Sequence, residues 1–454
     1  MAHFDLAINH GTQKSAQEDN KLRAEDHAAH DWYRFVLSFP PHLVRDYIDR
    51  FGLNSDTRVL DPFCGTGTTL VECKKLGIPS IGIEPNPVPF FASEVKVAWT
   101  VDPDAFLDHA MEVGHLTSEK LESQGIEDGD DFPLFRTRVK HQKVPPQLWT
   151  LPPEAHDLLL AESISPLPLH KTLVLLETLT NQSDERFSRY ERLALAKALV
   201  SVISNLHFGP EVGIGPPKKD APVVSAWLNV VRTMVDDLRT LRGKAHVQTL
   251  VYRADARQLR SVLRPTSIDA VITSPPYPNE KDYTRTTRLE SVLLGFVRNK
   301  QDLRCLKQTL LRSNTRGVYK ADQDDLLVAD NKEIQRIADA IERRRIELGK
   351  TSGFERLYPR VTKLYFGGIA RHLSELRSVL RPGAQLAYVV GDQASYLRVM
   401  IRTGQLIAEI ARGLGYEVID IDLFRTRLAT ATREQLREEV VILRWPKKRN
   451  IHKN

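Results

Sequence analysis

The sequence predicts an α/β protein in which a doubly wound, mainly parallel sheet carries two large and mainly helical insertions. The first observation is a strand–turn–helix–strand unit. A strand over residues 57–63 ends in a glycine-containing turn, a helix follows over 68–76, and a second strand covers 80–84. The second observation is that apolar stretches of strand length return later, at residues 247–252, 268–273, 385–390, 416–424 and 438–445.

The order of these segments predicts a core that is interrupted twice. A chain of 454 residues is too long for one ordinary core without additions. Helices are predicted over residues 42–51, 154–163 and 191–206, and a Pro/Gly-rich loop over 208–220. The expected parts are a flexible N-terminus, 1–25; core, 26–100; a helical insertion and candidate target-recognition region, 101–245; core, 246–292; a basic helical insertion, 293–365; core, 366–446; and a basic tail, 447–454.

The composition excludes several classes of protein. The chain has no run of 18 apolar residues, which predicts no membrane span, and no apolar signal segment, which favours a cytoplasmic location. Three cysteines without a Cys-x-x-Cys pair predict neither a disulfide framework nor structural zinc. His27 and His30 have no evident third ligand, so we expect no metal. The net charge of +6 is compatible with a polyanionic partner.

The turn after the first strand is a candidate cofactor site, because ligands bind at the carboxyl ends of strands in such sheets. Gly65 and Gly67 allow a tight turn, but Leu70 replaces the third glycine of a dinucleotide fingerprint, and no Walker lysine follows. S-adenosyl-L-methionine carries no phosphate and fits better.

Acidic residues follow three consecutive strands of the predicted sheet. Asp61 could accept from the ammonium group of that cofactor, Glu84 from both ribose hydroxyls, and Asp255 from the adenine amino group. Each has a simpler interpretation, as a helix cap, a surface charge and a loop cap respectively. Their shared position at strand ends favours one common ligand.

The strand over residues 268–273 ends in Ser274-Pro275-Pro276-Tyr277. Two prolines remove two N–H donors, so nearby carbonyls remain available as acceptors. The Ser274 hydroxyl and the Pro275 carbonyl could accept from an exocyclic amine and expose its lone pair. Tyr277 offers a flat face for an extruded base. The simpler interpretation is a Pro-Pro turn that ends a strand.

These two motifs together resemble the DNA amino-methyltransferase family, whose members make N4-methylcytosine or N6-methyladenine. Residues 30–42 resemble the family's segment around the methionine part of the cofactor, and residues 380–392 resemble a later core strand. The resemblance implies a Rossmann-like class I S-adenosylmethionine-dependent core and covers about half of the chain. It implies catalytic roles for Ser274, Pro275, Pro276 and Tyr277, and cofactor contacts by Phe39, Asp61, Pro62, Phe63, Gly65, Gly67, Thr68, Thr69, Glu84, Pro85, Asp255 and Ala256.

Within the family, a serine at position 274 favours cytosine N4, and the substrate would be double-stranded DNA. The alternatives are adenine N6, guanine N2 in RNA, and a non-catalytic DNA-binding protein. C5-cytosine methylation is disfavoured, because that reaction needs a nucleophilic cysteine and none of the three follows a proline. The larger insertion precedes Asp255, ahead of the family's usual place, so either insertion could read the target. A cognate restriction nuclease is a possible partner, and the oligomeric state stays open.

Two basic stretches are candidates for contacts with phosphate groups, residues 280–289 and 298–320. The alternative for such helices is an ordinary solvated face.

Overall fold

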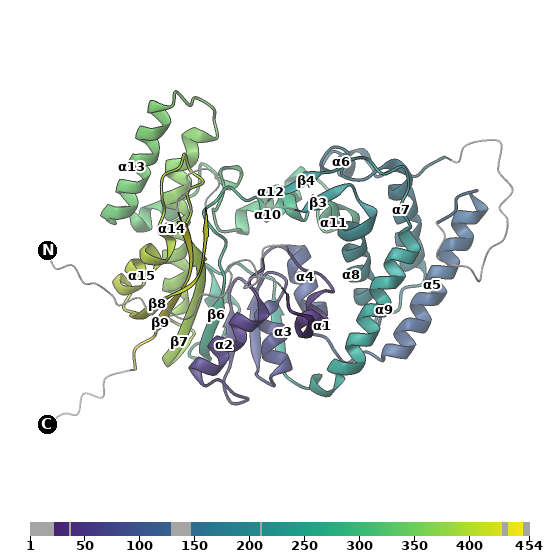
Figure 1. Cartoon of the computed structure of the whole chain (residues 1–454), viewed down its shortest axis with the longest axis horizontal. Helices are drawn as coiled ribbons and strands as arrows, with labels where there is room; N and C mark the ends of the chain where they lie inside the picture. The colour runs from purple at the N-terminus through teal and green to yellow at the C-terminus, as the bar shows by residue number, and fades with distance from the viewer. Residues whose placement is uncertain (1–21, 36–37, 129–146, 209–210, 429–434, 448–454) are drawn as a thin grey trace.

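The computed structural model describes residues 22–35, 38–128, 147–208, 211–428 and 435–447 (Figure 1). Within these residues, seven strands form one sheet in the order β5-β2-β1-β6-β7-β9-β8. All neighbours are parallel except β9, which is antiparallel to both β7 and β8. The strands are β1 Val59–Asp61, β2 Ser80–Ile83, β5 Thr249–Tyr252, β6 Ile268–Thr273, β7 Leu380–Gly391, β8 Glu417–Leu428 and β9 Gln435–Arg444.

This strand order confirms the predicted Rossmann-like, doubly wound and mainly parallel sheet. The chain runs outward from β1 through β2 to β5, and then returns to the other side of β1 with β6 and runs outward again. The reversal between β1 and β6 creates the crevice in which ligands bind in open α/β sheets. The turn after β1 and the Ser274 motif after β6 therefore flank the same crevice.

Helices cover both faces of the sheet. Ala270 and Ile272 of β6 share a core with α2, whereas Val271, between them, packs in the core under α14. This alternation is the two-residue period of a strand that is buried on both faces. The covering helices are α2 Pro41–Phe51 and α3 Thr68–Lys75 on one side, and α14 Tyr358–Leu376 and α15 Thr403–Gly413 on the other.

The first insertion is a helical bundle whose apolar core, in which Trp227 is fully buried, continues into the sheet domain through Leu70 and Val71 of α3. Figure 1 shows the bundle at the end of the molecule opposite β8. Its main helices are α5 Pro103–Ser123, α7 Pro166–Asn181, α8 Ser188–Ala198 and α9 Val223–Leu241. The elements that connect it are α4 Pro87–Lys96, α6 Pro153–His156, the π-helical turn Leu199–Ile203 and η4 Arg242–Lys244.

Three predictions inside this insertion need correction. The helix predicted over 154–163 ends at His156, because the chain then turns to bury Leu158 in a separate apolar cluster with Val292 and Leu306. The helix predicted over 191–206 ends in the π-helical turn. The loop predicted over 208–220 contains β4 Val212–Ile214, which pairs antiparallel with β3 Leu206–Phe208. Such pairing depends on neighbours rather than on local propensity.

The second insertion is less compact, and its predicted end is wrong. The boundary at residue 365 falls inside α14, whose residues Val361 and Tyr365 already pack in the core under the sheet. The insertion contains α12 Lys300–Thr309, η6 Thr315–Gly317, η7 Asp324–Val328, α13 Lys332–Glu347 and η8 Glu355–Leu357, and it is preceded by α10 Tyr283–Thr286 and α11 Arg288–Leu293.

The chain ends fall largely outside the described residues. Of the predicted flexible N-terminus, residues 22–25 are described and lead into η1 Ala24–Asp26 and α1 His27–His30; of the basic tail, Lys447 is described. A further 3-10 turn, η5, covers Leu259–Ser261. None of the described helices is both long and apolar enough to cross a membrane.

Candidate active site

A cavity of about 680 Å³ lies at the carboxyl ends of β1, β2, β5 and β6 and joins the two predicted motifs. It is therefore wide enough for a small-molecule cofactor and part of a second ligand. The predicted residues on its wall are Phe39, Phe63, Gly65, Thr68, Glu84, Pro85, Asp255 and Ala256 from the cofactor set, and Ser274, Pro275, Pro276 and Tyr277 from the catalytic set.

Four predicted cofactor residues do not line this cavity, namely Asp61, Pro62, Gly67 and Thr69. Gly67 has φ of +83°, and a Cβ there would lie 3.0 Å from the Cβ of Ser93, so glycine is needed for the turn itself. The Thr69 hydroxyl donates to the Ile272 carbonyl. In this structure these residues support the turn from behind and do not form part of the cavity wall.

Asp61 illustrates the difference most clearly, because its carboxylate is fully buried. Oδ1 accepts hydrogen bonds from the Thr273 hydroxyl at 2.6 Å and from the Phe63 backbone N–H at 3.1 Å. Oδ2 is buried and has no hydrogen-bond partner among the described residues. Burial raises the pKa of Asp61 to about 6. The expected direct contact with an ammonium group is not available in this geometry; instead, Asp61 joins the cofactor turn to the residue that precedes Ser274.

Glu84, in contrast, faces the cavity from the end of β2. Its Oε2 accepts from the Gly65 N–H at 3.1 Å and its Oε1 from the Asn86 N–H at 2.8 Å. Burial raises the pKa of Glu84 to about 7, and the nearby Asp61 charge adds to that shift. Each carboxylate oxygen keeps one lone pair, so both can still accept a hydroxyl of a ligand.

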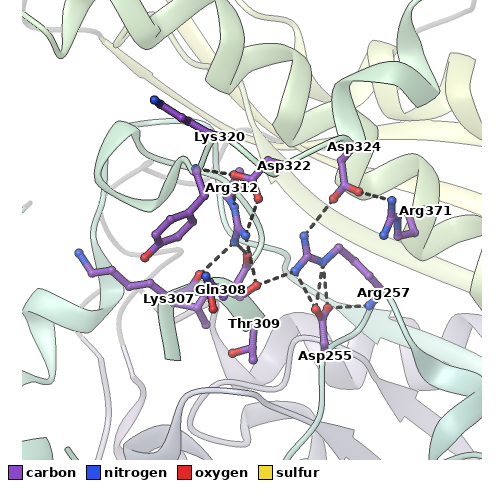
Figure 2. Close-up of polar contacts among 12 residues, drawn as sticks. Asp255, Arg257, Lys307, Gln308, Thr309, Arg312, Lys320, Asp322, Asp324 and Arg371 are labelled. Atoms are coloured by element: carbon purple, nitrogen blue, oxygen red, sulfur yellow. Dashed lines mark hydrogen bonds and ion pairs between the residues drawn. The ribbon is translucent and has the colours of Figure 1, made fainter. Parts of the chain in front are cut away.

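Asp255 carries a partner that the sequence interpretation missed (Figure 2). The Arg257 guanidinium forms a bidentate hydrogen bond with the Asp255 carboxylate, with Nε 3.0 Å from Oδ1 and Nη2 2.7 Å from Oδ2. Both side chains are nearly buried. The spacing of two residues could have suggested the pair, but nothing in the sequence indicates that the guanidinium folds back onto its own loop. An adenine amino group would share Asp255 with Arg257.

The Ser274 hydroxyl donates its single proton to the Val389 carbonyl on β7, at 3.1 Å. Its oxygen can therefore act as an acceptor in the cavity that Ser274 lines, where the Tyr277 hydroxyl is a second hydrogen-bonding neighbour. Tyr277 lies against Gly391, where a Cβ would come within 3.1 Å of the tyrosine ring. The glycine thus leaves room for the ring, and burial raises the pKa of the Tyr277 hydroxyl, which stays neutral.

Strands β8 and β9 contribute residues that the sequence interpretation did not single out. Phe424, Arg425 and Glu438 line the cavity together with Tyr277. Arg425 and Glu438 form a forked ion pair across the two strands, with Nε and Oε2 at 2.6 Å. The sequence has an aromatic residue in the β8 stretch, but only the cavity lining shows that β8, an edge strand, contributes Phe424 to this site.

A buried lysine holds the cofactor turn from behind. Lys96 donates to the Thr66 carbonyl at 2.7 Å and to the Tyr33 carbonyl at 3.2 Å. It thus joins the turn to the segment 30–42, of which residues 36 and 37 lie outside the described residues. Burial lowers the pKa of Lys96 to about 7. The sequence carries no signal for this role, because a lysine in an exposed-looking helix is usually solvated.

The basic stretch over 298–320 is only partly available for phosphate contacts. Arg312 is buried and bound to Asp322, and Lys307 pairs with Asp282 at 2.9 Å. The prediction that the basic side chains of this stretch contact phosphate groups is therefore wrong for these two residues. Among the described residues no group of three or more His, Cys, Asp or Glu could hold a metal ion.

Comparisons with known proteins find DNA methyltransferases among the relatives of this chain. The N6/N4 methyltransferase family model, described as DNA methylase, matches residues 8–88. Type II methyltransferase M.BsoBI of Geobacillus stearothermophilus is 26% identical over 92% of this chain and 85% of its own length. Type II methyltransferase M.AvaI of Anabaena variabilis is 25% identical over 91% and 86% respectively.

Among solved structures, the rRNA methyltransferase aviRa of Streptomyces viridochromogenes aligns over 93% of this chain and 94% of its own, with 11% identity and a TM-score of 0.33. That likeness is too low to inform function, so the fold assignment rests on the strand order. The sequence matches confirm the resemblance to DNA amino-methyltransferases.

Proposed function

Because the chain is a relative of the DNA amino-methyltransferases, we propose that it methylates the exocyclic N4 of cytosine at specific sites in double-stranded DNA. S-adenosyl-L-methionine is the methyl donor that this relationship implies. The observation that carries the proposal is the Ser274 hydroxyl, whose proton is committed to Val389 while its oxygen lies on the wall shared with Glu84.

The cofactor end of the cavity fits that donor. Glu84 accepts only backbone N–H groups, and no ion pair among the described residues engages it. Asp61 lies directly behind the turn with an unpaired oxygen. A ligand with two ribose hydroxyls and a net positive charge would satisfy Glu84 and would lower the cost of ionising both carboxylates. Glu84, Gly65 and Asp255 are the residues that would hold it.

When bound, S-adenosyl-L-methionine supplies an electrophilic methyl group on a sulfonium, and the protein contributes binding and orientation. Ser274 Oγ and the Pro275 carbonyl accept the two hydrogens of the target amine, which draws its nitrogen toward tetrahedral geometry. This would free the nitrogen lone pair for the methyl group that the cofactor supplies. Ser274 keeps its own proton on the Val389 carbonyl and does not act as a base, so the methylated and cationic amine would lose its surplus proton to water. Tyr277 and Phe424 both line the cavity, and their rings would stack on the extruded base.

A direct product analysis tests this function. The protein is incubated with isotopically labelled S-adenosyl-L-methionine and double-stranded DNA, the DNA is digested to nucleosides, and the labelled product is identified by mass. We expect N4-methylcytosine. Labelled N6-methyladenine would overturn the choice of base but not of reaction, since the matching family model covers both. Label in RNA alone would overturn the choice of DNA, and no transfer despite cofactor binding would favour a non-catalytic binder.

We further propose that the protein protects DNA from a cognate restriction nuclease, because the relatives named above are Type II methyltransferases. Sequencing of the methylated DNA would define one recognition sequence. A nuclease that cuts that sequence should fail to cut modified DNA. Methylation scattered over unrelated sequences would contradict this role.

A further inference from the structure

One short segment of the second insertion contacts two loops of the active site, the Asp255 loop and the loop that follows Tyr277. It runs from the end of α12 to η6, Gln308 to Thr315, and we refer to it as the strut. Five of its residues line the active-site cavity: Thr309, Leu310, Leu311, Ser313 and Asn314. The strut is therefore part of the cavity wall and not a peripheral addition.

At the base end, the strut holds the loop that follows Tyr277 through Glu280. The Glu280 carboxylate accepts from the Thr315 backbone N–H at 2.9 Å and from the Thr315 hydroxyl at 2.8 Å. The Glu280 N–H donates to the Ser313 carbonyl at 3.2 Å. Asn314 adds a hydrogen bond to the carbonyl of Lys281, at 2.9 Å.

Glu280 holds a backbone conformation that favours glycine, with φ of +67°. A side chain in this left-handed region is strained, and such strain persists only where the surrounding contacts determine it. A glutamate at this position, with both carboxylate oxygens engaged by Thr315, indicates that the side chain compensates for the strain.

At the cofactor end, the strut meets the Asp255 loop through Arg257 (Figure 2). While its fork binds Asp255, Arg257 Nη2 also donates to the Gln308 carbonyl at 3.2 Å. Its Nη1 donates to Asp324 of η7 at 2.9 Å, and Arg371 of α14 pairs with the other oxygen of Asp324 at 2.7 Å. One guanidinium thus joins the cofactor loop, the strut and η7.

The strut is itself fixed from within the insertion. Buried Arg312 donates to the Gln308 carbonyl at 3.2 Å, the same oxygen that Arg257 binds, and forms a fork with Asp322. Figure 2 shows the two guanidiniums converging on this carbonyl. The position of Gln308 is therefore determined from two sides.

We propose that the strut positions the loop that follows Ser274–Tyr277 relative to the Asp255 loop, with Glu280 as the positioning residue for the first loop and Arg257 as the positioning residue for the second. The proposal rests on the proposed function, since positioning is measured by methyl transfer. It assigns the second insertion to assembly of the active site and leaves the reading of DNA to other parts of the chain.

The base end is tested with Glu280→Gln, Glu280→Ala and Glu280→Gly. Glu280→Gly removes both the carboxylate and the backbone strain, whereas Glu280→Ala removes the carboxylate and keeps the strain. Comparison of these two variants separates the two effects. We expect Glu280→Gly and Glu280→Ala to lower kcat roughly tenfold to a hundredfold, because small displacements of reacting groups are costly. Glu280→Gln, which can still bond Thr315, should stay within about threefold of wild type. The Kd for S-adenosyl-L-methionine, measured by calorimetry without DNA, should change less than about twofold in all three.

The cofactor end is tested with Arg257→Gln and the matched control Arg371→Gln, which removes a guanidinium from the same Asp324 but touches neither the strut nor Asp255. We expect Arg257→Gln to raise the Kd for S-adenosyl-L-methionine roughly tenfold, and Arg371→Gln to change it less than about twofold. Thermal unfolding of each variant shows whether it folds, and the more conservative Arg257→Lys replaces Arg257→Gln if that variant does not.

Wild-type activity separates failure of this proposal from failure of the proposed function. Absence of methyl transfer by the wild-type protein overturns the function itself. If wild type is active, a Glu280→Gly variant with wild-type kcat overturns the base-end role, because the carboxylate would then be dispensable. Equal effects of Arg257→Gln and Arg371→Gln on cofactor binding overturn the cofactor-end role.

Discussion

The two ends of the active-site cavity differ in the kind of group that they present. The cofactor end carries carboxylates, Glu84 and Asp255, with Asp61 behind the turn. The base end presents the Ser274 hydroxyl, proline carbonyls and the rings of Tyr277 and Phe424. A charged donor is thus met by carboxylates, whereas the base end offers a hydroxyl, carbonyls and rings beside the ion pair of Arg425 and Glu438. We therefore expect binding of the cofactor and binding of the target base to respond differently to mutation and to pH.

The largest expected effect is at the base end. Ser274→Ala removes an acceptor that acts on the target amine, and we expect kcat to fall roughly a hundredfold to a thousandfold, as for other preorganised hydrogen-bonding groups. The Kd for S-adenosyl-L-methionine should be unchanged. Single-turnover kinetics and calorimetry measure the two quantities. Ser261→Ala, at an exposed serine outside the cavity, serves as the control. Loss of cofactor binding in Ser274→Ala would show that the two ends are not separate.

The next effect is at the cofactor end. Glu84→Gln keeps the shape of the side chain but replaces a charged double acceptor with one acceptor and one donor. We expect the Kd for S-adenosyl-L-methionine to rise roughly tenfold to a hundredfold, with kcat at saturating cofactor nearly unchanged. Glu94→Gln, on the exposed side of α4, is the matched control. An unchanged Kd in Glu84→Gln would remove Glu84 from the cofactor site.

The pH dependence of cofactor binding should also distinguish the cofactor end of the cavity from the base end, because only the cofactor end relies on carboxylates. Burial raises the pKa of Glu84 to about 7 and that of Asp61 to about 6, above their unfolded values. The stability linked to each group is therefore present below its unfolded pKa and is lost as pH rises through its folded pKa.

A ligand that needs the Glu84 carboxylate ionised will bind more tightly as pH rises. We expect the Kd to improve by up to about tenfold per pH unit below pH 7 and to level off above it. Calorimetry between pH 5.5 and 8.5 measures this trend, and Glu84→Gln should flatten it. An equally steep trend in that variant would assign the titration to another group.

The smallest expected effect concerns base stacking. Phe424→Ala removes one of two rings at the base end while Tyr277 remains. We expect the KM for DNA to rise roughly fivefold to tenfold, near the lower limit for loss of one stacking side chain. Steady-state kinetics with varied DNA measure it, and the Tm controls for lost packing against His42. A larger effect on cofactor Kd than on KM would place Phe424 at the wrong end.

Local sequence was sufficient wherever one segment carried the whole signal. β6 has the predicted bounds, 268–273, because an apolar run bounded by Ser274-Pro275 has no alternative ending. The helix predicted over 68–76 is α3, Thr68–Lys75, since the glycine turn before it fixes its start. In contrast, the strand pairing of residues 206–208 with 212–214 could not be predicted, because each stretch is too short to be apolar-periodic on its own.

The sequence by itself determined the fold class, the two motifs and the chemistry that they indicate, because those depend on residue types held at short spacing along the chain. Only the tertiary structure decided which side chains reach the cavity. It placed Asp61 behind the turn, committed Asp255 to Arg257, and brought Phe424 of β8 and the Gln308–Thr315 strut to the wall beside Ser274. The reason is physical: burial, ion pairing and long-range packing depend on contacts between segments that lie tens to hundreds of residues apart, and no local pattern encodes them.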